Sequence, residues 1–151
     1  MRTHFADSLD DLAADLASMC ALTVTAIADA TTALLDVDLP TAERVLDADT
    51  VLDKAAADWE HRAFSLLALQ APVAHDLRFT VGGLHIAASL QRMGGLATHV
   101  AKIARLRHPT PAVPPEARAV VHDMGRTAVA RATETQVSFQ TTRTSPSFSR
   151  R

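Results

Sequence analysis

Apolar residues recur every three or four positions over residues 5–34, which is the spacing of one face of an α-helix. This first stripe consists of Phe5, Leu9, Leu12, Leu16, Met19, Thr23, Ile27, Ala30 and Leu34. A second stripe of the same period consists of Val45, Leu52, Ala56, Trp59, Ala63 and Leu66. The pattern predicts two long amphipathic helices. Between them, residues 36–40 end the first helix, and Thr41 is predicted to be the N-cap of the second.

The stretch LLALQAPVAHDLRF, residues 66–79, interrupts the helical pattern for only a few residues. Pro72 cannot lie inside a helix, but it fits the first turn of one, where its missing N–H is not needed. We therefore expect a tight corner, with the second helix ending near Leu69 and a third beginning near Pro72. Because short corners join antiparallel neighbours, the three helices are predicted to form an antiparallel bundle.

The third helix carries two apolar stripes, so it is predicted to pack against more than one neighbour. The stripes consist of Leu77, Val81, Leu84, Ala88, Gln91 and Gly95, and of Ile86, Leu90, Met93, Ala97, Val100 and Ala104. Its interior also holds the glycine pairs 82–83 and 94–95. Since an interior glycine costs about 1 kcal/mol relative to alanine, these pairs indicate either close backbone approach or a weak helix.

The pattern changes after the third helix. Residues 108–114 form a proline-rich linker, and residues 115–133 are predicted to form a further helix. Residues 134–151 are rich in Ser, Thr and Arg and have no hydrophobic period, so a disordered tail is expected. The predicted fold class is all-α, with a three-helix bundle over residues 1–107, a partial fourth helix and a disordered C-terminal tail.

The amino-acid composition also favours a helical fold, because Ala and Leu dominate and aromatic residues make up only 4% of the 151 residues. The net charge of −2 conceals an acidic half, residues 1–60, and a basic half, residues 61–151. Either the halves pair across the bundle, or the basic half offers a surface to an acidic partner. A single cysteine, Cys20, fits a reducing cytosol. No apolar run approaches about 20 residues, so no membrane insertion is expected.

The junction LLALQAPVAHDLR, with Gln70, Pro72, Asp76 and Arg78, resembles the turn between the second and third helices of the PhoU family. The preceding AIADATTALLDVDLPTAERVLDADTVLD and the following LQRMGGLATHVAKIARLRHP agree in order, the latter with actinobacterial members. The resemblance covers about residues 1–131. It implies a cytoplasmic, all-α negative regulator of phosphate uptake and phosphate-starvation signalling. Such proteins contact the phosphate transporter ATPase and a sensor histidine kinase, and have no established enzymatic activity.

The chain departs from the resemblance in two ways. The family usually has two three-helix repeats, whereas residues 115–133 would supply only the start of a second, which suggests truncation near Thr133. Without a second repeat, the face that it would cover is exposed. Because the third helix is apolar on two sides, we expect the chain to self-associate through this face into a homo-oligomer. A non-functional fragment is the alternative.

Many members of the family also bear a Glu/Asp-x-x-x-Asp metal motif on the third helix. Gln91 and Gly95 stand at the matching positions, so no metal or other cofactor is expected there. Asp49 and Asp53 keep the i, i+4 spacing of an acidic pair on the second helix. They are expected to form a solvated helix face, and a helical-bundle metal protein using this pair is the other alternative. No catalytic nucleophile, phosphate-binding loop or nucleic-acid motif appears.

At the junction, Asp76 is expected in the first turn of the third helix, where it complements the helix dipole. Arg78 then pairs with carboxylates of the first helix, or it belongs to a docking surface. The predicted partner-binding residues are Gln70, Asp76, Arg78, Gln91 and Arg92. His85 and His99 have surface or packing roles in this interpretation.

Overall fold

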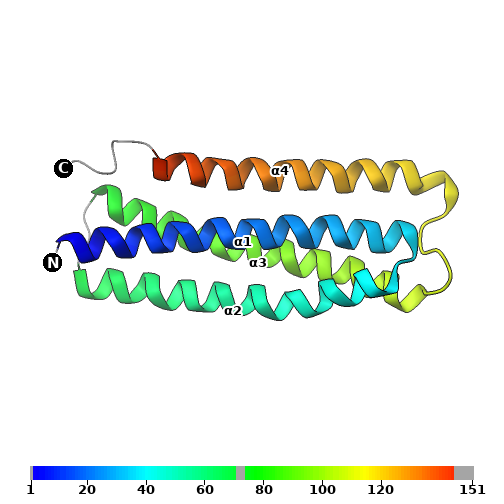
Figure 1. The fold of residues 1–151 in the computed structure, drawn as a ribbon, viewed down its shortest axis with the longest axis horizontal. Coiled ribbons are helices and arrows are strands. Elements are labelled where there is room, and N and C mark those ends of the chain that lie inside the picture. The colour runs from blue at the N-terminus through cyan, green and yellow to red at the C-terminus, as the bar shows by residue number, and fades with distance from the viewer. Residues whose placement is uncertain (1, 71–73, 145–151) are drawn as a thin grey trace.

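The computed structural model describes the backbone of residues 2–70 and 74–144, and the side chains of residues 5–69 and 76–136. Within these ranges the chain is helical, without a strand, and the predicted all-α class is confirmed. The elements are α1 (Arg2–Asp36), α2 (Leu39–Gln70), α3 (Ala74–Arg107), the short 3-10 helix η1 (Pro115–Ala117) and α4 (Arg118–Thr144). Helices α1, α2 and α3 run as an antiparallel bundle, and α4 lies along α1 (Figure 1).

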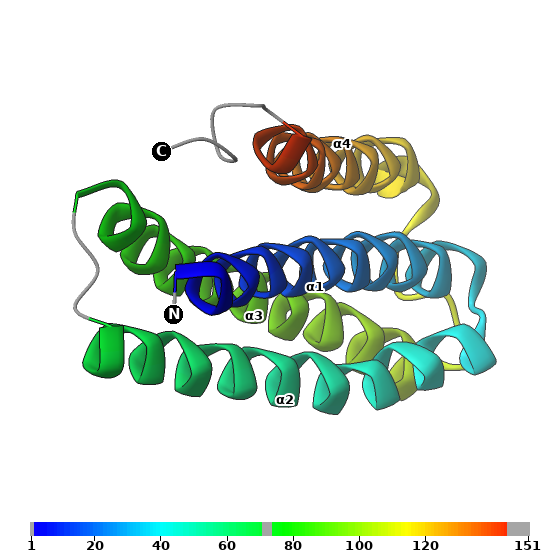
Figure 2. The ribbon, with the colours of Figure 1, turned by 60° about the vertical axis from the view of Figure 1, so that its left-hand side comes forward.

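Helix α1 is the centre of the molecule, because it packs against α2, α3 and α4 (Figure 2). By length and composition alone, residues 5–36 of α1 would suffice to cross a membrane, so the expectation that no segment reaches that length is wrong for α1. Core helices of bundles meet the same criterion, and α1 occupies that position here. Its predicted stripe is confirmed, with Leu12, Leu16 and Met19 at most 1% exposed.

The core of the bundle forms around Trp59 of α2, which is 1% exposed. Its indole N–H donates a 2.8 Å hydrogen bond to the main-chain carbonyl of Leu12 in α1. The ring lies against Gly83 of α3, where any Cβ would overlap with it. In the same way, a Cβ at Gly94 would overlap with the side chain of Leu52 in α2. One glycine of each pair therefore permits close packing of α3 on α2, which is the first of the two predicted explanations.

Of the two apolar stripes predicted for α3, one faces the bundle and the other is largely exposed. Leu90, Ala97 and Ala104 are buried, whereas Leu77 and Val81 are 42% and 40% exposed. The stripe that begins at Leu77 is therefore wrong as a packing face. Instead α3 approaches α1 and α2 largely through small residues, which contribute little to a hydrophobic pattern. The buried ones are Thr80, Gly83, Ala87, Gly94, Ala97, Thr98, Ala101 and Ala104.

The connection between α1 and α2 is built by two residues. Val37 adopts the left-handed conformation with φ 57°, and the N–H of Asp38 donates to the carbonyl of Ala33, which closes the end of α1. The carboxylate of Asp38 then accepts bonds from Thr41, at 3.1 Å from the main-chain N–H and 2.6 Å from the hydroxyl. Asp38 is therefore the N-cap of α2, and the prediction that Thr41 caps it is wrong by three residues.

Helix α4 begins at Arg118 and continues to Thr144, so the disordered tail predicted from residue 134 is wrong for residues 134–144. Residues 145–151 lie outside the described part. A helix that is already nucleated extends at small cost even through polar residues. Local contacts assist it here: Arg131 pairs with Glu134 at 3.1 Å, and the hydroxyl of Thr135 donates to the carbonyl of Arg131.

Candidate functional site

Two of the predicted metal-site positions meet across the α2–α3 interface. The amide nitrogen of Gln91 in α3 donates a 2.8 Å hydrogen bond to Oδ1 of Asp53 in α2. An amide N–H cannot ligate a cation, and here it occupies the carboxylate that would otherwise be available. Asp49 lies one turn from Asp53, while Gly95 has no side chain that could supply a ligand atom. The donor set present does not fit a metal cluster.

The side chains that the structure describes contain no group of three or more His, Cys, Asp or Glu arranged to hold a metal ion. The thiol of Cys20 is fully buried, and desolvation by burial raises its pKa to about 11. At neutral pH the thiol is therefore protonated, and a buried, protonated thiol is a poor nucleophile.

Four of the five predicted docking residues lie on α3, and the fifth, Gln70, is the last residue of α2. Asp76 lies in the first turn, as predicted. Arg78 and Arg92 are exposed, whereas Gln91 turns toward α2 and is engaged by Asp53. Only the helical backbone of Gln70 is described, so its side chain lies outside the described residues. Of the predicted set, Arg78 and Arg92 are therefore the exposed side chains that form no hydrogen bond or ion pair with another helix in the described part of the chain.

The exposed side of α3 is a basic surface. Arg78, His85, Arg92 and His99 follow one another at intervals of seven residues, and all four are exposed. Seven residues make almost two helical turns, so these side chains form one row with about 10 Å between neighbours. We call this row the basic stripe. Lys102, Arg105 and Arg107 continue the positive charge to the end of the helix, and no acidic residue follows Asp76 within α3.

The positive charges of α3 have no ion-pair partner among the described residues. Three carboxylates of α1 pair elsewhere: Asp15 with Arg62, Asp29 with Arg44 at 3.4 Å, and Asp36 with Arg118 at 3.5 Å. The other three, Asp7, Asp10 and Asp11, form no ion pair with α3. The predicted pairing of Arg78 with α1 is therefore wrong. Of the two interpretations of the acidic and basic halves, pairing across the bundle holds for Arg62 and Arg118. The basic residues of α3 remain available to a partner.

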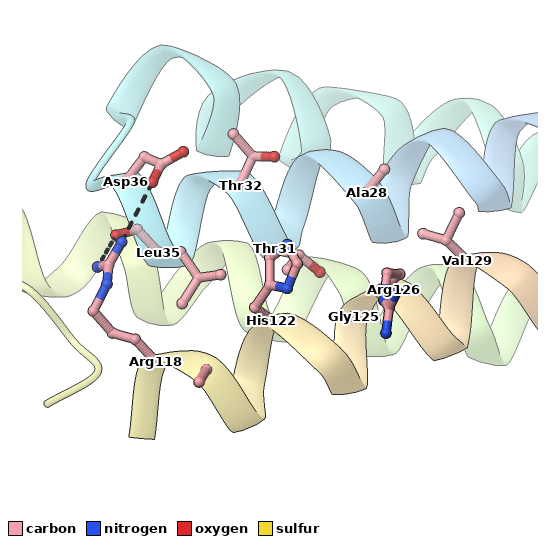
Figure 3. Close-up of a pocket in the computed structure, with 11 residues that line it drawn as sticks. Ala28, Thr31, Thr32, Leu35, Asp36, Arg118, His122, Gly125, Arg126 and Val129 are labelled. Atoms are coloured by element: carbon pink, nitrogen blue, oxygen red, sulfur yellow. Dashed lines mark hydrogen bonds and ion pairs between the residues drawn. The ribbon is translucent and has the colours of Figure 1, made fainter. Parts of the chain in front are cut away.

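A groove of about 550 Å³ runs between α1 and the first half of α4 (Figure 3). Arg118 closes one end by donating to the main-chain carbonyl of Leu35 and pairing with Asp36. Gly125 allows α4 to approach, because any Cβ there would overlap with Thr31. Arg118 therefore satisfies an otherwise open carbonyl at the end of α1, and its role is to fasten α4. The contact between Arg118 and Leu35 was not predicted from the sequence, because these residues are 83 positions apart.

Comparison with known proteins agrees with this architecture. Residues 16–104 match the PhoU domain. The chain is 47% identical to a protein of Mycobacterium tuberculosis named phosphate-specific transport system accessory protein PhoU homolog 2. The alignment spans 129 residues, which are 85% of this chain and 61% of that protein. A PhoU homolog 1 of Mycobacterium leprae is 45% identical, and the alignment spans 58% of its length. A PhoU homolog of Rhizobium meliloti is 36% identical over 98 residues, which are 65% of this chain and 41% of that protein. The chain thus spans about three fifths of the length of its mycobacterial relatives.

Proposed function

Because the chain belongs to the PhoU family, we propose that it is a non-catalytic accessory protein of phosphate-specific transport that represses phosphate uptake and phosphate-starvation signalling. Its mycobacterial relatives carry the name of such accessory proteins. It acts by binding the transporter's ATPase subunit and a sensor histidine kinase. Both contacts are made in the cytoplasm.

The basic stripe on α3 carries this proposal. Arg78 and Arg92 present two permanent charges about 21 Å apart along one helix, since fourteen residues separate them. Neither arginine forms an ion pair with another described residue, so neither stabilises the fold through such a pair. Unpaired positive charge on a rigid helix steers the approach of an acidic surface and fixes its orientation. The partner's contact surface is accordingly acidic.

Exposed apolar side chains beside the stripe add contact area. Leu77 and Val81 flank its first half, and Leu96 and Ile103 flank its second half at 64% and 50% exposure. Charged residues set orientation and association rate, whereas buried apolar contacts supply much of the affinity. A docked partner would cover both kinds of residue on α3.

The function is tested with the intact gene in its own organism. Deletion is expected to release a phosphate-responsive reporter from repression in phosphate-rich medium, and the wild-type chain to restore repression. The double variant Arg78→Glu/Arg92→Glu is expected to fail. The double variant Arg126→Glu/Arg131→Glu changes charge equally on exposed positions of α4 and is expected to restore repression. A deletion that leaves the reporter unchanged contradicts the proposed function.

A further inference from the structure

The basic stripe alternates two kinds of basic residue. Arg78 and Arg92 carry guanidinium groups, which stay charged throughout the pH range of a cell. His85 and His99 follow them and carry imidazole groups, the side chains whose charge commonly changes between about pH 5 and 8. Half of the stripe therefore has a fixed charge, and the other half can gain charge as the pH falls.

Both histidines lie on the side of α3 that faces away from the core. Their side chains are exposed, whereas Ala87 and Ala101, each two residues further along the helix, are 3% and 0% exposed. Two residues turn an α-helix by about 200°, so each imidazole points almost opposite to a buried neighbour. A proton can therefore reach either imidazole, and the charge that it adds does not enter the core.

Among the described residues, no carboxylate of a neighbouring helix holds these imidazoles in an ion pair. The bond from Gln91 to Asp53 sets the register of α2 against α3, and the position of Leu16 beside Gly83 sets that of α1. The charged or titratable residues that come about level with the two histidines are Asp15 and Asp29 of α1, and Glu43, Arg44, Asp47, Asp58, Glu60, His61 and Arg62 of α2. Of these, Asp15 pairs with Arg62 and Asp29 with Arg44. The charged residues of α3 closest along the helix are the basic Arg78, Arg92, Lys102 and Arg105. The charge that a histidine gains is therefore presented to a partner and not to the fold.

The spacing of the stripe gives this charge its effect. Arg78 and Arg92 are about 21 Å apart along the helix, which is well beyond the screening length of about 8 Å at physiological ionic strength. The two arginines therefore act on a partner as separate charges. Protonation of His85 and His99 doubles the charge of the stripe and reduces the spacing between charges to about 10 Å. Neighbouring charges then act together on an acidic surface.

We propose that the basic stripe is a pH-sensitive docking surface, on which His85 and His99 strengthen the binding of an acidic protein surface as the pH falls. Arg78 and Arg92 supply the binding that remains at higher pH. The proposal rests on the proposed function for the identity of the partner, whereas the change in charge belongs to this chain alone. Contact with the partner, and with it repression, therefore strengthens when the cytoplasm becomes more acidic.

Fluorescence anisotropy with labelled poly-L-aspartate tests the change in charge on the full chain. The probe stays ionised at both about pH 6 and about pH 8, so its own charge does not vary. The dissociation constant of the wild type is expected to fall about fivefold from the higher to the lower pH, at constant low salt. His85→Gln/His99→Gln should bind as the wild type does at the higher pH and lose most of this gain. His85→Arg/His99→Arg should bind tightly at both pH values.

A matched control is available in two exposed histidines outside the stripe. His61→Gln/His122→Gln removes the same number of imidazoles from α2 and α4, and it should respond to pH as the wild type does. Circular dichroism at both pH values establishes that each variant is folded. Failure of the wild type to bind the probe at about pH 6, or equal pH responses of the wild type and His85→Gln/His99→Gln, would overturn the proposal.

The same proteins are then titrated with the transporter's ATPase subunit at both pH values. Comparing the wild type with His85→Gln/His99→Gln at each pH cancels the titration of the ATPase subunit itself. The gain in affinity at the lower pH is again expected in the wild type and not in the glutamine variant. Binding with equal pH responses in the two proteins overturns the pH-sensitive surface and leaves the proposed function intact. Absence of ATPase binding at either pH, together with a histidine-dependent response to poly-L-aspartate, contradicts the proposed function and supports the pH-sensitive surface.

Discussion

The amide of Gln91 donates a 2.8 Å hydrogen bond to the carboxylate of Asp53, and this bond joins α3 to α2 at the place where the resemblance implied a metal site. A carboxylate at position 91 would face Asp53 as a like charge, whereas the amide faces it as a donor. With Gln91 at this position, the contact between α3 and Asp53 is attractive without a cation.

The first prediction concerns this pair. Gln91→Glu replaces a donor by a second negative charge, so the free energy of unfolding at pH 7 is expected to fall by about 1 kcal/mol. Because both side chains are exposed, added salt screens their repulsion, and the deficit in unfolding free energy relative to wild type should shrink as the salt concentration rises. Urea denaturation at several salt concentrations measures this deficit. Gln91→Ala is the control, since it removes the bond without adding charge and its deficit should vary less with salt.

A second prediction concerns metal binding. The double variant Gln91→Glu/Gly95→Asp is expected to acquire iron or zinc, because it places two carboxylates one turn apart on α3. Position 91 contacts Asp53 of α2, and Asp49 lies one turn from Asp53. Gly95 has open space where a side chain would begin. Elemental analysis of purified protein should find stoichiometric metal in the variant and not in the wild type. Stoichiometric metal in the wild type would revive the metal-protein alternative.

The glycine pairs of α3 supply an internally controlled third prediction. Gly83→Ala and Gly94→Ala are each expected to lower the free energy of unfolding by about 1–3 kcal/mol, because the new methyl groups overlap with Trp59 and Leu52. Gly82→Ala and Gly95→Ala meet no atom within 4 Å and should raise it by up to about 1 kcal/mol. Thermal and urea denaturation of all four variants test this. Equal effects within a pair would contradict the packing of α3 on α2.

A fourth prediction follows from the cap of α2. Hydrogen bonds from the hydroxyl and then the main-chain N–H of Thr41 hold the pKa of Asp38 below its usual value, with a smaller contribution from Arg44. A lowered folded-state pKa means that this stabilisation is present above the ordinary value near 4 and is lost as the pH falls through the folded-state pKa. Wild type should therefore exceed Asp38→Ala in stability at neutral pH, and the difference should narrow in acid.

Asp38→Asn separates capping from ionisation. Asparagine is also a good N-cap, but it does not titrate. Its stability is expected to lie above that of Asp38→Ala at all pH values, without the acid-dependent narrowing. If the wild type keeps its full advantage over Asp38→Ala throughout the acid range, ionised Asp38 is not the group that stabilises the cap.

The sequence predicted those parts of the fold that rest on large apolar side chains at helical spacing. Leu12, Leu16 and Trp59 appear in the core where the stripes placed them. It failed for α3, whose contact face is built from glycine, alanine and threonine, because small residues pack by letting backbones approach and leave little hydrophobic signal. It also failed at the end of α4, where polar composition was taken for disorder although an existing helix extends at little cost.

The candidate site was predicted in part. Asp53 and Gln91 were each singled out for a different role, but their contact joins positions 38 residues apart and could not follow from helical periodicity. The basic stripe could have been found, since Arg78, His85, Arg92 and His99 are spaced by seven residues. That these charges lack ion-pair partners among the described residues could be seen only in the three-dimensional arrangement. There, three carboxylates of α1 pair with Arg44, Arg62 and Arg118, and none pairs with α3.

The central claim is that this protein acts by contact through the basic stripe of α3. Isothermal titration of the purified chain with the transporter's ATPase subunit, and separately with the cytoplasmic part of the sensor kinase, tests it most directly. The account predicts saturable binding that weakens with salt, is reduced about tenfold or more in Arg78→Glu/Arg92→Glu, and is unchanged in Arg126→Glu/Arg131→Glu. Absence of binding by folded wild-type protein, or equal binding by the two double variants, would contradict it.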